Sequence, residues 1–506
     1  MTMLEPLIGG FADALQPMNL LMTVTGTALG IAVGALPGLS SPMAIIVLLP
    51  LTYGMETLPA LLLLMGVYVG TKLGGSYSAI LLRTPGTPAG ACTALDGHPM
   101  ARRGEAGLAL GYATMGSTLG GLFGWLIAVS FVPLIAAIAL RSGPADIALI
   151  GVAGLVMVSA FVRGSMVKGL IGVTLGVLIS TIGLDPEAGV ARYTFGVLDL
   201  MSGIPFAAAL VGLFGLTVVL SDLTLIGDRS HLVTRKVRIA LPGARDLARY
   251  WQSIAIGGTY GTTIGAIPGV GAEGATWLAY ATARRRSKTP EKFGDGAPEG
   301  VLAPEATNNA TTGGTMIPMM TLGIPGDGST AVMLGALLLH GVTPGVTMMR
   351  DNGDIVWGIL AGLGVATLAM FVLGWKAIGI FIAVLQQDRS WLFPFVLVLV
   401  TIGAFATTNT FFPVWVAIVF GIVGLAFESR GFPVVTIVLG IILGPVIEIN
   451  LRLALSLSNG QWSTFVATWP RVALLALVLL LIALEIYRAV KTGKVDKTGR
   501  ATETQP

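Results

Sequence analysis

Long apolar runs recur along the chain, and many are long enough to cross the hydrocarbon core of a bilayer, which takes about 20 helical residues. Four other apolar runs are too short, and each is interrupted near its middle by Pro-Gly. Proline ends a helix because it lacks a backbone donor and clashes with the preceding turn, so the chain can turn back there. Each of these runs therefore predicts a re-entrant hairpin. The four hairpins are expected over residues 20–53, 76–95, 251–283 and 317–340.

The remaining apolar runs predict about 11 full spans. Together with the hairpins they give an all-α polytopic membrane protein. The spans are expected near residues 57–73, 106–138, 145–162, 168–183, 204–226, 300–316, 355–384, 391–406, 412–427, 431–448 and 471–488.

The Pro-Gly interruptions fall into two matching pairs. The string GALPGL from Gly34 matches GAIPGV from Gly265 at an offset of 231 residues, and Pro85-Gly86 matches Pro325-Gly326 at an offset of 240. A Gly-Gly pair also precedes the second break in each half. The sequence therefore predicts an internal duplication, with a first repeat over residues 1–250 and a second over 251–506, each containing two hairpins.

Positive charge sets the expected orientation, because Lys and Arg concentrate in cytoplasmic loops. The basic loop from Arg229 to Arg249, the run Arg284 to Arg286 and the tail from Lys491 to Arg500 are all expected on the cytoplasmic side, with the N-terminus outside. The first half then crosses the membrane an odd number of times, so the two halves enter from opposite faces. Inverted repeats with paired broken helices are typical of secondary transporters, in which substrate binds near the bilayer midplane.

Composition agrees with a membrane protein. Of 506 residues, 54% are hydrophobic and 11% charged, and the mean hydropathy is +0.84, whereas soluble domains carry about 25% charged residues. The net charge of +4 on so apolar a chain is explained by cytoplasmic loops and predicts no nucleic-acid partner. The single cysteine, Cys92, excludes an intramolecular disulfide, and the three histidines lack zinc-ligand spacing, so no metal or cofactor is expected.

The hairpin tips are the candidate substrate site. The outgoing helix of each hairpin begins with unpaired N–H groups and the positive end of its dipole, which favour an anion. Small hydroxyl residues follow or flank three of the tips, where they either cap a helix or bind a carboxylate. The candidate substrate-binding residues are Pro37, Gly38, Ser40, Ser41, Arg83, Thr84, Pro85, Gly86, Thr87, Pro268, Gly269, Pro325, Gly326, Ser329 and Thr330.

Arg83 is the arginine in a predicted tip, and a guanidinium can hold a carboxylate with two parallel hydrogen bonds. The alternative is that Arg83 reaches back to an interface or pairs with Asp96. Lys72 ends a predicted span and is expected to snorkel to the inner face.

Four further residues are candidate ligands for a coupling ion, either sodium or a proton. Asn308 and Asn309 lie in an unusually polar predicted span and offer hard amide oxygens, with hydrogen bonding between helices as the alternative. Glu273 and Asp327 each follow a tip, where they serve as helix caps or as ligands for the ion.

Several strings resemble those of the large membrane subunit of bacterial tripartite tricarboxylate transporters, the TctA type. The resemblance covers about residues 15–490. The strings are GALPGL from Gly34, GGS from Gly74, RTPGTP from Arg83, LDGHPM from Leu95, PEGVLAPEATNNA from Pro298 and TLGIPG from Thr321.

This resemblance implies an inner-membrane subunit that works with a small four-span membrane subunit and a periplasmic solute-binding protein. Such systems take up citrate or another carboxylate by symport with an ion rather than with ATP. The absence of a Walker A string from the chain agrees with ion coupling. An elevator-like movement of one repeat bundle against the other is expected by analogy only.

Two other classes of function stay open. A channel or a scaffold for the partner subunits would share the same spans, but a channel would not accumulate substrate against its gradient. An intramembrane hydrolase would need a Ser/His/Asp or metal cluster at membrane depth, and the sequence places His98 and His231 in inner loops and His340 at an outer end.

Overall fold

The computed structural model describes residues 4–36, 38–161, 165–217, 220, 238–385 and 392–496. Most of these described residues are helical, and the one sheet among them is two-stranded and antiparallel and pairs Gly183 with Arg192. Among the described residues, seven helices are long and apolar enough to cross a membrane, and several shorter apolar helices accompany them. The chain is therefore an all-α multi-pass membrane protein. Pro37 and the part of the basic loop over residues 221–237 lie outside the described residues.

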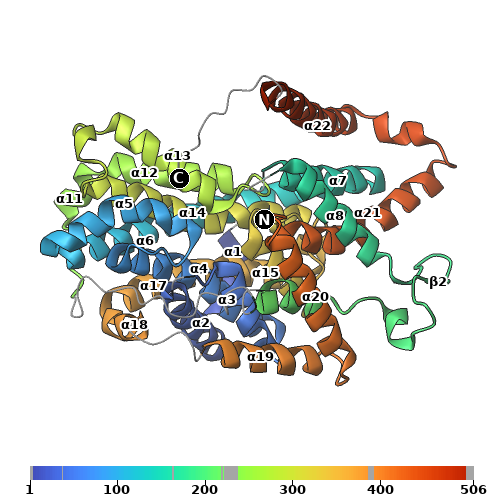
Figure 1. The fold of residues 1–506 in the computed structure, drawn as a ribbon, viewed down its shortest axis with the longest axis horizontal. Helices are drawn as coiled ribbons and strands as arrows, with labels where there is room; N and C mark the ends of the chain where they lie inside the picture. The colour runs from blue at the N-terminus through green and yellow to red at the C-terminus, as the bar shows by residue number, and fades with distance from the viewer. Residues whose placement is uncertain are drawn as a thin grey trace. The chain divides into compact units, whose positions relative to one another are not determined.

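The chain forms two compact units, and each combines segments of both sequence halves. The large unit comprises Met1–Arg141 and Ile204–Arg430, and the small unit comprises Ser142–Gly203 and Gly431–Pro506. The helices of the large unit (Figure 1) are α1 Leu4–Ala14, α2 Pro17–Ala35, α3 Ser41–Leu48, η1 Leu49–Thr52, α4 Thr57–Leu82, η2 Pro88–Gly90, α5 Ala91–Met100, η3 Ala101–Glu105, α6 Ala106–Ala139, α9 Phe206–Leu210, η5 Val211–Leu216, α11 Ala244–Arg249, α12 Trp251–Gly265, α13 Gly271–Arg286, η6 Pro290–Lys292, α14 Pro298–Leu322, α15 Gly328–Leu339, α16 Met348–Asp351, α17 Gly353–Lys376, α18 Ile378–Leu385, α19 Leu392–Ala406 and α20 Phe412–Glu428.

The described part of the small unit contains the strands and four long or medium helices. An ionic cluster joins its loop to α21, where Arg192 and Arg452 both contact Glu448 at 2.6 Å. Backbone N–H groups of residues 187 and 188 and the Arg452 guanidinium hold the pKa of Asp185 down at about 2. The elements of this unit are α7 Pro144–Phe161, α8 Met166–Ser180, β1 Gly183–Leu184, β2 Ala191–Arg192, η4 Leu198–Ser202, α21 Val434–Leu457, η8 Trp462–Val466 and α22 Trp469–Asp496.

The expected boundary between a span and a following hairpin is wrong in both halves. Residues 57–82 form one helix, α4, where a span over 57–73 and a hairpin from 76 were expected. Likewise α14 runs unbroken from Pro298 to Leu322, past the expected boundary near residue 316. The Gly-Gly pairs do not end these helices, because they lie where another backbone approaches: a Cβ at Gly74 would lie 2.3 Å from the carbonyl oxygen of Ile31. Each of these long helices ends at the Pro-Gly break instead.

Small residues let two helix pairs pack backbone against backbone. Along α2, a Cβ at Gly26, Gly30 or Gly34 would lie within 2.5 Å of a carbonyl oxygen of α4. Such spacing of small residues at every fourth position is typical of close helix packing in membranes. The partner carbonyls belong to Leu63, Val67 and Thr71.

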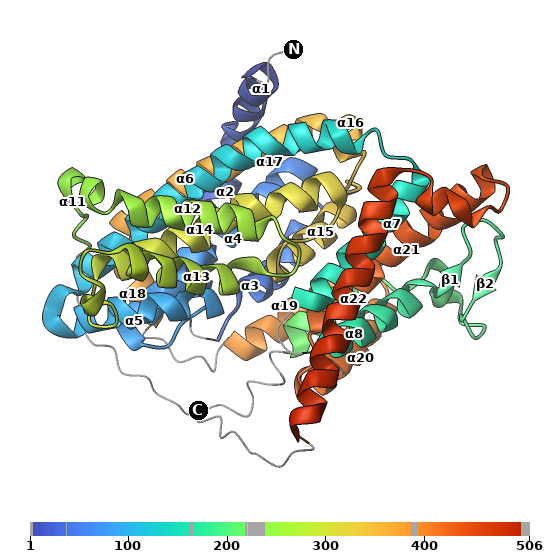
Figure 2. The ribbon, with the colours of Figure 1, turned by 90° about the horizontal axis from the view of Figure 1, so that it is seen from above.

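The helices α12 and α14 lie side by side (Figure 2) and repeat these contacts. Gly257, Gly261 and Gly265 of α12 approach the carbonyl oxygens of α14, and they follow the three glycines of α2 at the offset of 231 residues. The residues of α14 that they contact lie 240 positions after Leu63, Val67 and Thr71 of α4, and these are Ala303, Thr307 and Thr311. Equivalent contacts at constant offsets are what a duplicated helix pair would produce.

We expect Gly70→Ala to prevent normal folding of the large unit. A Cβ at this position would lie 2.3 Å from the carbonyl oxygen of Thr27, and a backbone atom in a packed helix pair has little room to move. The matched control is Gly379→Ala, since nothing lies within 4 Å of a Cβ there. Size-exclusion chromatography of the two variants in detergent tests this expectation, and a monodisperse Gly70→Ala protein with wild-type thermal stability would contradict it.

Candidate functional site

Four short turns interrupt the helices at the Pro-Gly breaks, and we number them as tips. Tip 1 (residues 36–40) joins α2 to α3, tip 2 (residues 83–87) joins α4 to η2 and α5, tip 3 (residues 266–270) joins α12 to α13, and tip 4 (residues 323–327) joins α14 to α15. Each sequence break therefore lies between two helices, as the Pro-Gly pattern predicts.

The tips meet in pairs. In the first pair, the N–H of Gly86 in tip 2 donates to the carbonyl of Gly75 in α4, and a Cβ at Gly86 would lie 2.0 Å from the carbonyl oxygen of Gly34, in the last turn of α2 just before tip 1. In the second pair, the N–H of Gly269 donates to the carbonyl of Gly326 at 3.0 Å. Only glycine fits positions where a turn approaches another backbone segment this closely.

Contacts also join one pair of tips to the other. A Cβ at Gly328, directly after tip 4, would lie 3.1 Å from Cγ of Pro42, directly after tip 1. Asp327 of tip 4 also reaches α4, where Tyr68 donates to Oδ2 at 2.9 Å and Nζ of Lys72 lies 3.6 Å from the same oxygen. Helix ends from both halves of the sequence thus converge around α4.

Asp327 caps α15 with its own carboxylate. The backbone N–H of Thr330 donates to Oδ1 at 2.8 Å, and the Thr330 hydroxyl accepts from the N–H of Asp327 at 2.9 Å. The N-terminus of α15 is therefore already balanced by a negative charge, which in turn is paired with Lys72. The expectation that Lys72 snorkels to the inner face is wrong, because α4 continues for ten residues beyond it and the side chain is buried with 6% exposed.

The helices α4 and α14 cross next to the tips and join the two halves through polar contacts. The hydroxyls of Tyr68 and Thr315 lie 3.0 Å apart, and the Asn308 amide donates to the carbonyl oxygen of Lys72 at 3.4 Å. Further along, Ser76 donates to the Glu305 carboxylate at 2.6 Å. The successive pairs run in opposite directions along the two helices.

Several buried polar atoms of α14 and tip 2 have no hydrogen-bond partner within the described part of the chain. They are Oδ1 of Asn308, both amide atoms of Asn309 and the hydroxyl of Thr87. Buried polar groups are normally paired, so an orphaned group at a functional site commonly faces a ligand, an ion or water. These three side chains come from tip 2 and from α14, both of which the sequence had singled out.

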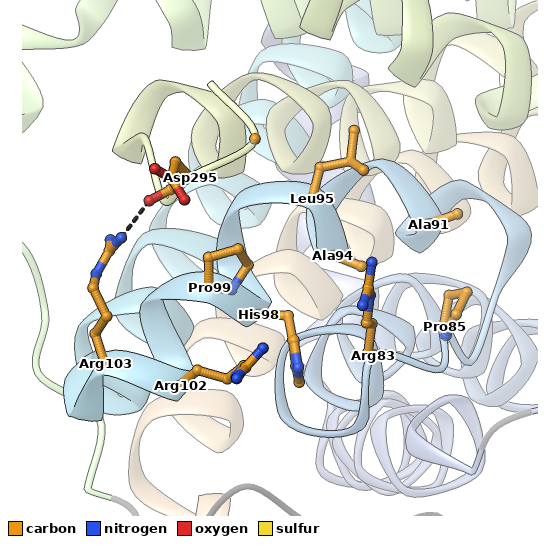
Figure 3. Close-up of a pocket in the computed structure, with 11 residues that line it drawn as sticks. Arg83, Pro85, Ala91, Ala94, Leu95, His98, Pro99, Arg102, Arg103 and Asp295 are labelled. Atoms are coloured by element: carbon orange, nitrogen blue, oxygen red, sulfur yellow. Dashed lines mark hydrogen bonds between the residues drawn. The ribbon is translucent and has the colours of Figure 1, made fainter. Parts of the chain in front are cut away.

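Arg83, the first residue of tip 2, lines a separate basic cavity. It ends α4 in the left-handed conformation, with φ of 59°, and its side chain is exposed. The cavity has a volume of about 670 Å³, and Figure 3 shows Arg83, His98, Arg102 and Arg103 around it. Arg103 is held by the carbonyl of Asp295 and by Glu105, whereas no ion pair to Arg83 or Arg102 is formed among the described residues. The expected alternative pairing of Arg83 with Asp96 is not formed.

The structure brings some predicted site residues together and separates others. Ser41 accepts a hydrogen bond from Thr71 of α4 at 2.9 Å, and Ser329 and Thr330 are buried at the start of α15. Thr84 is exposed and Pro85 lines the basic cavity. Ser40 begins α3 without a side-chain cap bond. The remaining predicted residues lie at or just beyond their tips, and these are Gly38, Gly86, Thr87, Pro268, Gly269, Glu273, Pro325 and Gly326.

Sequence reasoning missed the polar residues that surround the crossing. Glu305 lies in the string PEGVLAPEATNNA, but no functional role was predicted for it, although an acidic residue inside a predicted span indicates function. Asp96 is fully buried and accepts hydrogen bonds from three backbone N–H groups of residues 294–297 and from the Tyr280 hydroxyl. The other missed residues are Tyr68, Ser76, Thr93 and Ser117.

Comparison with known proteins places these observations in a family. The model of the tripartite tricarboxylate transporter TctA family matches residues 20–439. An Agrobacterium vitis protein named "Uncharacterized 52.8 kDa protein in TAR-I ttuC' 3'region" is 35% identical over 98% of this chain and 99% of its own length. A second A. vitis protein, "Uncharacterized protein in TAR-II ttuC' 3'region", is 34% identical over 46% of this chain and 97% of its own length. No solved structure matches the chain.

Proposed function

Because the chain belongs to the TctA family of tripartite tricarboxylate transporters, we propose that it is the subunit that moves a carboxylate across the bacterial inner membrane by symport with an ion. The observation that carries this proposal is the meeting of the four tips beside a buried crossing whose amide and hydroxyl groups lack partners. A secondary transporter needs such a site, with irregular backbone held inside the protein and polar groups free for the substrate. The substrate class includes citrate and other tricarboxylates or dicarboxylates.

The proposal includes the partners that the family implies. A small four-span membrane subunit would assemble with this chain, and a periplasmic solute-binding protein would deliver the substrate. The apolar surfaces of α22, none of whose span is buried, are available to lipid or to that small subunit. We further propose that inverted repeats underlie the fold, that the C-terminus is cytoplasmic, and that an elevator-like movement of one helical bundle against another carries the substrate. The matching glycine contacts of α2 with α4 and of α12 with α14 support an internal duplication of the chain.

Transport in proteoliposomes tests the proposal. Vesicles holding both membrane subunits, with the solute-binding protein added, are given radiolabelled citrate and a panel of related carboxylates under imposed sodium or proton gradients. The expected result is saturable uptake that accumulates one of these acids against its gradient. An uptake rate that is the same with and without the ion gradients and the binding protein would overturn the proposal. Saturable flux without accumulation of the substrate would favour a channel.

Arg83 is proposed to hold a substrate carboxylate in the basic cavity. Arg83→Ala removes a charge-assisted hydrogen bond worth roughly 1.5–3 kcal/mol, so the concentration for half-maximal uptake should rise about tenfold or more. The matched control is Arg83→Lys, which keeps the charge and should lose less. Protein levels in the membrane should be normal for both variants because the side chain is exposed. Unchanged uptake kinetics in Arg83→Ala would remove Arg83 from the site.

A further inference from the structure

Glu305 of α14 is fully buried and is held by hydroxyl groups from three different helices. Ser76 of α4 donates to Oε1 at 2.6 Å, Thr93 of α5 donates to the same oxygen, and Ser117 of α6 donates to Oε2 at 2.8 Å. Among the described residues no lysine, arginine or histidine lies within ion-pair distance of this carboxylate, and the nearby Lys72 pairs with Asp327 instead. A buried charge without a counter-ion is costly, so the neutral acid is stabilised relative to the carboxylate.

Hydroxyl partners suit both forms of the acid. A hydroxyl donates to a carboxylate, but it can also accept from a protonated carboxyl group after rotating its own hydrogen elsewhere. Ser76 has such an alternative acceptor, the carbonyl oxygen of Lys72 at 3.3 Å. Glu305 can therefore gain or lose a proton without leaving a hydrogen unpaired.

Asp96 gives an internal contrast. It is equally buried, but its Oδ1 accepts from the backbone N–H groups of Gly294, Gly296 and Ala297. Backbone amides only donate, so this oxygen is surrounded by donors that cannot accept a hydrogen, and the Tyr280 hydroxyl contacts the other oxygen. The two buried acids thus differ in their partners: both oxygens of Glu305 contact only hydroxyl groups, whereas Oδ1 of Asp96 contacts only backbone N–H groups.

The spacing of the oxygens around Glu305 fits a proton better than an alkali cation. The contacts of Ser76 and Ser117 are hydrogen-bond lengths. Oxygen ligands of a hard cation of calcium's size lie about 2.3–2.6 Å from the ion itself, so ligands around it must stand farther apart from one another than hydrogen-bonded oxygens do.

We propose that Glu305 is the site where the transporter binds and releases its coupling proton. The coupling role of this proton rests on the proposed function, whereas the exchange of a proton at Glu305 does not. The proton comes from water on one side of the membrane, adds to a carboxylate oxygen of Glu305, and leaves to water on the other side. Other titratable groups lie on the elements packed against α14, and they are Tyr68, Lys72 and Tyr77 of α4, Cys92, Asp96 and His98 of α5, Tyr112 of α6, Tyr260 of α12, Glu273, Tyr280, Arg284, Arg285 and Arg286 of α13, Arg350 and Asp351 of α16, and Asp327 beside α15.

A short chain of contacts connects this proton to the candidate substrate site. When Glu305 is protonated, Ser76 can turn its hydrogen to the carbonyl oxygen of Lys72. That same carbonyl accepts from the Asn308 amide at 3.4 Å, and Oδ1 of Asn308 is one of the unpartnered atoms. Protonation of Glu305 thereby competes with the bond that orients Asn308, which couples the two sites.

Infrared difference spectroscopy tests proton exchange without any substrate. Purified protein in detergent is stepped between acidic and alkaline buffer, and the carbonyl stretch of a protonated carboxylic acid is followed. The wild type should show a buried carboxylic acid band that appears as the pH falls and is missing from Glu305→Gln. The matched control Glu299→Gln, on the same helix with a Ser287 partner, should keep the band. If Glu305→Gln does not fold, Ser117→Ala should shift the band by removing one donor. A wild-type band that Glu305→Gln retains, or no band at all, would overturn the proposal.

Transport of radiolabelled citrate by the full complex in proteoliposomes tests the coupling. A pH gradient of one unit supplies about 1.4 kcal/mol per proton, equivalent to about tenfold accumulation. Glu305→Gln should lose this accumulation yet still exchange internal for external citrate. A proton band together with wild-type uptake that ignores the pH gradient would overturn the coupling role of Glu305. If the wild type moves none of the carboxylates of the uptake panel, the proposed function fails, while the infrared result stands separately.

Discussion

Lys72→Ala should destabilise the large unit by about 3 kcal/mol or more and abolish transport. Removing one partner of a buried ion pair leaves the other charge uncompensated, and such changes cost roughly 3–5 kcal/mol. Here the stranded group is Asp327, whose side chain is only 12% exposed and which also caps α15. The loss should appear as a lower unfolding midpoint of the purified protein in detergent and as absent uptake in vesicles.

Two further variants separate this effect from a general loss of positive charge. Lys376→Ala removes an exposed lysine from the end of α17 and should leave the midpoint unchanged. The double variant Lys72→Met with Asp327→Asn removes both charges and keeps an N-cap residue, so it should recover a large part of the lost stability. Equal losses in the single and double variants would show that the ion pair is not the cause.

Asp96→Ala should cost at least about 3 kcal/mol, because it strands several donors at once. Three backbone N–H groups and the Tyr280 hydroxyl lose their acceptor, and each buried unsatisfied donor costs roughly 1–3 kcal/mol. The segment that these groups fix leads directly into α14, so the position of the crossing depends on it. Thermal unfolding of the purified variant measures the effect.

The matched control for this change is Asp295→Ala. Asp295 lies in the same segment but is exposed, and its backbone carbonyl rather than its side chain accepts from Arg103. Its replacement should leave the unfolding midpoint within about 0.5 kcal/mol of the wild type. Similar losses in the two variants would mean that the segment as a whole, and not the buried carboxylate, is sensitive to change.

The sequence was sufficient to predict the four tips because a Pro-Gly break acts locally. Proline ends a helix wherever it lies, and glycine permits the turn and the close approach at Gly86 and Gly326. The helical class and the approximate positions of most helices were also predictable, because long apolar runs determine them. The match between the two halves was visible in short strings alone.

The contents of the polar crossing could not be predicted in the same way. Lys72 and Asp327 are 255 residues apart in the chain, so no local pattern reveals that they form a pair. Gly74 looked like a helix end, but it is a packing position against Ile31 within a longer helix. Glycine thus has two meanings in a membrane helix, and only the neighbouring helix distinguishes between them.

The backbone-to-backbone interfaces of α2 with α4 and of α12 with α14 also restrict how the molecule can change shape. Where carbonyl groups of one helix touch the Cα atoms of another, there are no side-chain rotamers that could absorb sliding or tilting. Each of these two helix pairs should therefore move as a rigid body during a transport cycle. Bending is then confined to the four five-residue tips and to more loosely packed contacts elsewhere. Two spin labels within one helix pair should therefore keep a constant separation, whereas the separation of two labels on either side of a tip should change.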